Sequence, residues 1–166
     1  MKILVFSDSH GVTDKMETAL AEHRGETDAV IHLGDGAGDL KRCAVPEGIP
    51  VITVSGNYED FFSAFLPNDH PPERIVEFGG VRILCTHGHR YGVKSSVARA
   101  VARAGSSGAG LLLFGHTHRP LDVSETLPSG EILRIFNPGT AGNGYPSSYG
   151  IVEIRDGQIL TSHRYF

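Results

Sequence analysis

Short apolar runs, each closed by a polar or glycine-rich cluster, recur along the whole chain and predict strands separated by loops. In the first half these runs alternate with amphipathic segments, as is typical of strand–helix units with a mixed or parallel sheet. The last third contains mostly strands. The predicted strands are Lys2–Phe6, Ala29–Leu33, Val51–Val54, Glu73–Phe78, Val81–Cys85, Leu111–Phe114, Asp122–Leu127, Ile132–Phe136, Tyr149–Ile154 and Ile159–Arg164.

Three segments carry apolar residues at helical spacing. A helix is predicted over Thr13–His23 with Thr13 as its N-cap, and a short one over Glu59–Leu66. A third is predicted over Val93–Ala104, ended by the glycines of 105–110. The first should bury the face of Val12, Met16, Leu20 and His23, and the third should place Val93, Val97, Val101 and Ala104 inward and Lys94, Arg99 and Arg103 outward.

Turn residues indicate how the strands connect. Gly79-Gly80, Pro128-Ser129-Gly130 and Asp156-Gly157 each separate two predicted strands and favour hairpins. An α/β first half followed by antiparallel strands suggests two sheets packed face to face. We therefore predict one domain over residues 1–166 with a four-layer α/β sandwich fold, in which two mixed β-sheets lie between outer helices.

Composition narrows the class of protein. The chain has 166 residues, 40% of them hydrophobic, and a formal net charge of −4, which gives no general attraction to nucleic acids or anionic lipids. No apolar stretch is long enough to span a bilayer. Cys43 and Cys85 stand in separate segments, and a structural pair is not expected without any sign of secretion. We predict a cytoplasmic protein.

Five polar clusters follow five of the predicted strands in order. They are Asp8-Ser9-His10, Gly34-Asp35, Gly56-Asn57, His87-Gly88-His89 and Gly115-His116-Thr117-His118. Strand ends that lie side by side at one edge of a sheet can bring such groups to one point. Their side chains are carboxylates, imidazoles and an amide, without a thiolate, which favours a hard-to-borderline divalent metal.

The spacing suggests how the ligands would be divided between two ions. A two-metal hydrolytic site needs a bridging ligand and several ligands for each ion. Asp35 is the best available bridge, because it has two oxygens and glycines on both sides. The pairs at i and i+2, Asp8 with His10 and His116 with His118, can each face one site. Asn57 and His87 supply an amide oxygen and an imidazole.

As a set, these motifs resemble the calcineurin-like metallophosphoesterases, and most of all their small YfcE-type phosphodiesterase subgroup. The match includes Asn137-Pro138-Gly139-Thr140, similar to a late Asn-Pro-Gly-Ser loop of that subgroup. The resemblance implies a phosphoester hydrolase in which a hydroxide held between two ions attacks phosphorus, with Mn²⁺ favoured and Fe²⁺, Co²⁺, Ni²⁺ or Zn²⁺ as alternatives. By position it assigns Asp8, His10, Asp35 and His118 to the first ion, and Asp35, Asn57, His87 and His116 to the second.

Two positions depart from the pattern. Many relatives read Gly-Asp-x-x-Asp and Gly-Asn-His-Asp/Glu. In these relatives the second Asp of the first motif orients the His of the second motif as proton donor to the leaving group. Here Gly38 and Tyr58 occupy those positions. The leaving group must then take its proton from water, from His10 or from His89, or need none. This favours diesters with acidic leaving groups over alkyl monoesters.

Several residues carry more than one interpretation. His89 is a ligand, a contact to substrate phosphate or a surface residue, and with Tyr58 and Asn57 it forms the candidate substrate-binding set. Asp39 either supports the ligands or caps a helix. Asn137-Pro138-Gly139-Thr140 would also fit a simple tight turn. The remaining histidines are expected to be structural or exposed: His23, His32, His70 and His163.

The aromatic segment of the short helix also has two interpretations. Phe61, Phe62, Phe65 and Leu66 exceed what one buried face needs. Core packing is expected, with a homodimer contact or a pocket wall as the alternative.

Three functions remain in competition. The leading one is a metal-dependent phosphodiesterase acting on a small anionic phosphoester, since no basic groove or aromatic ladder suggests a polynucleotide. A phosphomonoesterase on the same site is its rival. A non-catalytic scaffold of the retromer-subunit type would not need every ligand, yet all seven positions carry competent groups.

Overall fold

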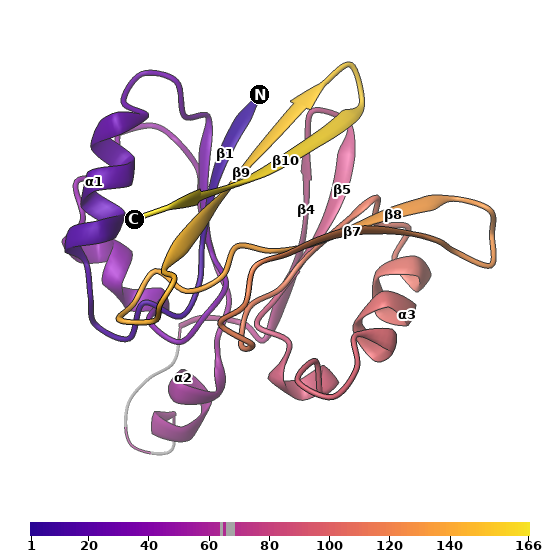
Figure 1. Cartoon of the computed structure of the whole chain (residues 1–166), viewed down its shortest axis with the longest axis horizontal. Helices are drawn as coiled ribbons and strands as arrows, with labels where there is room; N and C mark the ends of the chain where they lie inside the picture. The colour runs from indigo at the N-terminus through magenta and orange to yellow at the C-terminus, as the bar shows by residue number, and fades with distance from the viewer. Residues whose placement is uncertain (64, 66–68) are drawn as a thin grey trace.

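The computed structural model describes residues 1–63, 65 and 69–166. Two mixed five-stranded sheets form its centre, and α1 and α3 lie on opposite outer sides of them (Figure 1). This confirms the predicted α/β sandwich. The helices are α1 (Asp14–Glu22), α2 (Asn57–Phe62) and α3 (Ala98–Ser106), with short 3-10 helices η1 (Ala37–Arg42) and η2 (His89–Tyr91).

All ten predicted strands are present, and no strand end differs from its prediction by more than one residue. The first sheet has the order β10-β9-β1-β2-β3 and the second has the order β4-β5-β6-β8-β7. The strands are β1 (Lys2–Phe6), β2 (Ala29–His32), β3 (Val51–Thr53), β4 (Glu73–Phe78), β5 (Val81–Thr86), β6 (Leu111–Leu113), β7 (Leu121–Thr126), β8 (Ile132–Asn137), β9 (Ser148–Arg155) and β10 (Gln158–Tyr165).

Three hydrophobic clusters correspond to the three contacts between four layers. Between the sheets, Ile3 and Ile31 of the first pack with Leu113 of the second. Outside the first sheet, Met16 and other residues of α1 cover β1 and β2. Outside the second, Val101 and its neighbours on α3 cover β5, β6 and β8. The alternation of side chains along each central strand supplies both faces with apolar surface.

Parallel pairing explains why the polar clusters meet. In the first sheet β1 pairs in parallel with β2, and β2 with β3. In the second, β5 pairs in parallel with β6. The carboxyl ends of the strands that precede the clusters therefore lie together within each sheet. The antiparallel strands β9 and β10 extend the first sheet beyond β1, and the antiparallel strands β4 and β7 form the two edges of the second sheet.

Two helix predictions need correction. The short helix is displaced toward the N-terminus, to Asn57–Phe62, because it begins directly after Gly56, where Glu59 at the third position accepts the Gly56 backbone N–H. Of the predicted end, Leu66 lies outside the described residues. The third helix begins at Ala98 and not at Val93, since Ser96 Oγ accepts the Ala98 backbone N–H.

Two smaller expectations, for the aromatic residues and for Arg103, were wrong, and the predicted N-cap of the first helix was confirmed. Phe61 and Phe65 are 70% and 77% exposed, so core packing does not account for them. Thr13 stands at the N-cap of α1 but its side chain makes no capping hydrogen bond. Arg103, predicted to point outward, forms an ion pair with Glu73 of β4. Cys43 is partly buried and Cys85 is buried, and both are free thiols.

Candidate metal centre

The first and second sheets meet at the loops that follow β1, β2, β5 and β6. Asp8 N donates to the Gly34 carbonyl and His10 N to the Asp35 carbonyl, so two clusters of the first sheet are bonded to each other. In the second sheet, Gly115 N donates to the His87 carbonyl. His116 N then donates to Asp8 Oδ2 at 3.0 Å, which joins the two sheets at the site. The predicted clusters therefore converge.

One group of side chains gathers around Asp8. His118 Nε2 lies 3.1 Å from Asp8 Oδ1. His10 Nε2 lies 3.5 Å from His118 Nε2 and 3.9 Å from Asp35 Oδ2. One ligand atom each from Asp8, His10 and His118 lies within 4.8 Å of the others, a spacing that could hold one metal ion.

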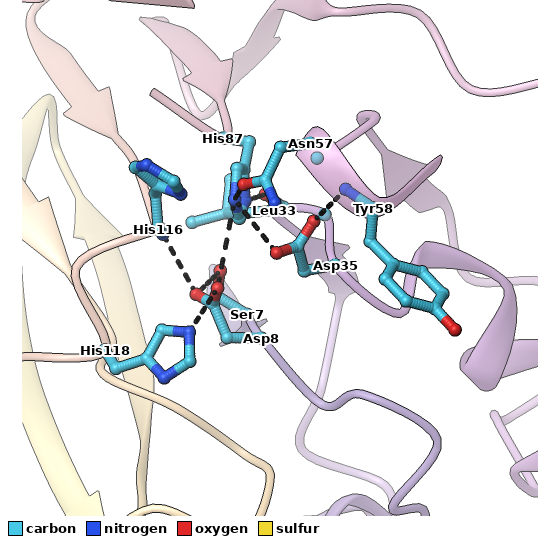
Figure 2. A network of polar contacts seen from close by, with 12 residues as sticks. Ser7, Asp8, Leu33, Asp35, Asn57, Tyr58, His87, His116 and His118 are labelled. Carbon is cyan, nitrogen blue, oxygen red and sulfur yellow. Dashed lines mark hydrogen bonds and ion pairs between the residues drawn. The ribbon is translucent and has the colours of Figure 1, made fainter. Parts of the chain in front are cut away.

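A second group gathers around His87. Its Nε2 lies 3.5 Å from Asp35 Oδ2 and 3.2 Å from Asn57 Oδ1. Ligand atoms of Asp35, His87 and His116 again lie within 4.8 Å of one another. Figure 2 shows Asp35 and Asn57 turned toward His87, with Asp8 on its other side. Asp35 Oδ2 thus faces both groups.

The hydrogen bonds around His87 leave a place for a cation. The Leu33 carbonyl can only accept, so His87 Nδ1, at 2.8 Å, carries the proton. In the neutral imidazole, the Nε2 lone pair then points at Asp35 and Asn57 oxygens, which also present lone pairs. Asp8 Oδ1 is buried and makes no hydrogen bond, although His87 and His118 are near. These residues fit a divalent ion, which would satisfy every one of these atoms.

The pKa shifts reflect the same crowding. Without a metal ion, His87 can also carry a second proton on Nε2 and donate it toward Asp35. Burial disfavours charge on Asp35, but this hydrogen bond and the positive charge of His87 prevail and lower the pKa of Asp35 to about 2. Burial likewise opposes charge on His87, yet Asp35 and Asp8 raise its pKa. Burial and the charges of His87 and Lys94 lower the pKa of His116 to about 4. His116 is therefore neutral at pH 7 and its lone pair is available to a metal.

The backbone at the site adopts a conformation that is rare for residues with a side chain. Among the described residues, six other than glycine have positive φ, and five of these are predicted ligands. Such conformations cost about 1–3 kcal/mol each and persist only where the surroundings enforce them. The sixth is Asp156, in the β9–β10 hairpin turn. The five ligands are Asp8, His10, Asp35, His116 and His118.

Close backbone packing explains the glycines next to the ligands. A Cβ at Gly56 would lie 2.1 Å from Asp35 Oδ1, and one at Gly34 would lie 2.5 Å from Gly56 N. A side chain at Gly56 would therefore displace Asp35, and one at Gly34 would separate the two loops that meet there.

Glu59 was missed by sequence reasoning. Its carboxylate accepts the backbone N–H groups of Asp35, Gly36, Ala37 and Gly56 at 2.7–3.0 Å. Burial opposes its charge, but these hydrogen bonds lower its pKa, so it stays ionised. The signal was present, because Glu59 stands three residues after Gly56, as in a capping box, and fits the Asp/Glu of the family pattern.

A second supporting network lies behind the Asp8 loop. Gly34 N donates to His32 Nδ1, so the other ring nitrogen donates to Ser9 Oγ at 3.0 Å. Ser9 Oγ donates in turn to Asp39, which also accepts the Gly11 N–H. Burial lowers the pKa of His32 to about 4 and keeps the ring neutral. His32 is structural, as predicted, and Asp39 supports the loop without capping a helix.

The Asn137–Thr140 loop is more than a tight turn. Buried Asn137 Nδ2 donates to the Gly115 carbonyl and to Thr117 Oγ1, which fixes the loop of the two histidines. Thr140 Oγ1 donates to the Asp8 carbonyl at 2.8 Å. His163, also predicted to be structural, places its Nε2 2.8 Å from the Asn137 carbonyl.

The structure places two predicted substrate-binding residues at the border of the site. His89 Nε2 lies 2.9 Å from Asp60 Oδ2, and its buried Nδ1 makes no hydrogen bond. Its ring lies 5.4 Å from the His87 ring, so it faces the second group without joining it. Tyr58 donates its backbone N–H to Asp35 Oδ1, and its half-exposed ring turns away from that carboxylate (Figure 2).

Comparison with known proteins agrees with this geometry. The model of the calcineurin-like phosphoesterase superfamily domain matches residues 1–157. A probable metallophosphoesterase, YsnB of Bacillus subtilis strain 168, is 32% identical over 143 residues, which cover 84% of this chain and 75% of the relative.

Solved structures share the fold. A predicted phosphoesterase from Streptococcus pneumoniae TIGR4 has a TM-score of 0.75 and 28% identity, with 99% of this chain and 88% of that chain covered. Vps29 of Chaetomium thermophilum has a TM-score of 0.71 at 17% identity, with 100% and 95% covered, which shows a common fold alone. By its sequence and its fold, this chain belongs to the calcineurin-like phosphoesterase superfamily.

Proposed function

We propose that this chain is a metal-dependent phosphodiesterase that acts on a small anionic phosphoester. The observation that carries the proposal is the position of Asp35 Oδ2, which lies 3.9 Å from His10 Nε2 and 3.5 Å from His87 Nε2. One carboxylate oxygen thus faces both candidate metal positions. This is the arrangement that a pair of ions with a shared ligand requires.

Seven residues would hold the two ions. Asp8, His10 and His118 would hold the first, and Asn57, His87 and His116 the second, with Asp35 common to both. When bound, the ions would activate water at neutral pH and neutralise phosphoryl oxygens. Oxygen and nitrogen donors suit Mn²⁺, which the family resemblance favours, and also Fe²⁺, Co²⁺, Ni²⁺ and Zn²⁺.

The chain's own residues supply orientation and a preorganised pocket. The hydrogen bond from His87 Nδ1 to the Leu33 carbonyl fixes the tautomer and leaves Nε2 to the site. Tyr58 N holds Asp35 Oδ1, so the other oxygen keeps its direction. Asp8 is held by His116 N and by Ser7 Oγ. Little of this arrangement needs to move when substrate binds.

The preference for diesters rests on groups that this chain lacks. Gly38 has no side chain where relatives carry the orienting Asp, and Tyr58 replaces the His. The Tyr58 side chain is 52% exposed, and its ring meets the His10 ring edge-on at 6.2 Å. A phenol is in general a weaker proton donor to a leaving group than the imidazolium that it replaces here. Leaving groups that need no proton, such as phenolates, are therefore favoured.

The fold shared with Vps29 gives the alternative of a non-catalytic scaffold. Against it, all seven candidate ligands are competent and converge, an arrangement that a scaffold would not need. Metal content and turnover distinguish the two. A phosphomonoesterase on the same site is the other alternative, and the comparison of esters described below separates it from a diesterase.

We expect Asp35→Ala to lose both ions, because its carboxylate serves both groups. Metal analysis of the purified variant after dialysis against Mn²⁺ checks this. Asp35→Asn keeps an acceptor for Tyr58 N and should therefore fold normally. It should also lose both ions, which would show that the loss does not come from misfolding. Glu47→Ala removes an exposed carboxylate elsewhere and should keep two ions per chain. Two ions retained by the Asp35 variants would rule out the bridge.

His87→Ala should lose one ion and reduce kcat by about 10²–10³, as expected when one stabilising group at the reacting centre is removed. Metal titration and steady-state kinetics at saturating Mn²⁺ measure both effects. His23→Ala is the control, because that ring contacts Tyr149 on the outer side of the first sheet. A wild-type rate for His87→Ala would favour a mechanism with one ion.

The missing proton donor should make the rate depend steeply on the pKa of the leaving group. General acid catalysis contributes about 10²–10⁴ in rate, so without it aryl diesters should be hydrolysed much faster than alkyl monoesters. A series of substituted phenyl and alkyl esters measures the slope. Tyr58→Phe should change it little. A shallow slope together with a large loss in Tyr58→Phe or His89→Ala would reveal a replacement acid.

A further inference from the structure

A pocket of about 540 Å³ opens beside the loop that carries His116 and His118. Thr117, between these two histidines, is part of its wall, and Phe114 of the same segment lies in its lining. The pocket therefore borders the candidate metal centre. None of its lining residues was assigned a role by the sequence motifs.

Two positive charges line this pocket without a partner. Lys94 and Arg119 are exposed, and neither side chain forms a hydrogen bond or ion pair with any residue that the structure describes. Other arginines do find acids, as Arg103 pairs with Glu73 and Arg134 with Asp122. On a chain with a net charge of −4, two free cations at one pocket are suited to an anion.

The rest of the lining is largely apolar. Val93 and Val97 from the segment before α3 and Leu121 at the start of β7 form part of the wall. Val93 is 5% exposed and Val97 is partly buried in the same cluster. A ligand that fits such a wall has an apolar or aromatic body, with an anionic group placed at the cationic side.

We propose that this pocket is a subsite for one arm of the phosphoester substrate, and that this arm carries a second anionic group bound by Lys94 and Arg119. Its apolar or aromatic part would pack against Val93 and Val97. The inference rests on the proposed function, because it places the reacting phosphate at the neighbouring metal centre. It narrows the substrate class to phosphoesters with a second negative charge, a phosphate or a carboxylate.

The pocket and the candidate metal centre share one loop, because Thr117 lines the pocket and stands between His116 and His118. A substrate with two anionic groups could engage the metal centre and this pocket together, whereas one with a single charge would leave both cations unpaired.

Two matched substrates test the subsite: thymidine 5′-(p-nitrophenyl phosphate), and the same compound with a 3′-phosphate. Wild-type protein with Mn²⁺ should show a kcat/KM about tenfold higher for the second compound, the gain expected from a charge-assisted hydrogen bond. Lys94→Ala and Arg119→Ala should each remove most of this preference. Hydrolysis of the first compound should fall much less than that of the second in these two variants, because the first compound has no second anionic group for Lys94 and Arg119 to bind.

Arg99→Ala is the matched control, since it removes an exposed positive charge nearby on α3 that does not line the pocket. It should keep the preference. Calorimetric binding of thymidine 3′,5′-bisphosphate, with and without Mn²⁺, gives a readout other than turnover. We expect affinity about tenfold weaker in Lys94→Ala and Arg119→Ala than in wild type and Arg99→Ala.

The outcomes separate the two claims. If the wild type hydrolyses neither compound, the proposed function fails, and the binding experiment alone decides the subsite. If it hydrolyses both at the same rate, or if Lys94→Ala and Arg119→Ala bind the bisphosphate as the wild type does, the subsite is wrong while the phosphodiesterase stands.

Discussion

The two oxygens of Asp35 have different tasks, and the rest of the site depends on this division. Oδ1 accepts the Tyr58 backbone N–H at 2.8 Å, which fixes the carboxylate plane. Oδ2 faces His10 on one side and His87 on the other. Because the first oxygen is held by the backbone of α2, the second cannot rotate away. The site is therefore built before any ligand arrives.

The residues around Asp35 stabilise this arrangement although it requires unfavourable backbone conformations. Five ligands have left-handed backbone conformations, which unconstrained chains avoid. Glu59 binds four backbone N–H groups in the loops on either side of Asp35. On the opposite side, Thr140 holds the Asp8 carbonyl. Many of the buried polar residues that the structure describes lie in the ligand loops or support them, and they link segments that are far apart in the sequence.

Much of the fold could be predicted, because hydrophobic alternation and turn residues mark all ten strands. The convergence of the five clusters could also be predicted, since each follows a strand. The sheet order could not: nothing local indicates that β9 pairs with β1 or that β8 lies between β6 and β7. These pairings depend on long-range packing that no single segment contains.

The sequence singled out the candidate ligands, which the structure brings together, more readily than the residues that support them. A ligand such as His118 stands in a glycine-flanked motif, whereas Ser9 and Thr140 act through hydrogen bonds that only tertiary structure creates. The exposed aromatic residues of α2 were misjudged for a related reason. Phe61 has an apolar side chain, but the short helix begins at Asn57, two residues before the predicted start, and leaves Phe61 exposed to solvent. A dimer contact or a pocket wall through these aromatic residues stays a prediction.

The central claim is that one carboxylate joins two metal positions, and anomalous diffraction tests it most directly. Crystals grown with Mn²⁺ and measured at the manganese edge should show two peaks per chain, about 3.5–4 Å apart, on either side of Asp35 Oδ2. The first should lie beside Asp8, His10 and His118, and the second beside Asn57, His87 and His116. A single peak, or two peaks that do not share Asp35, would contradict the account.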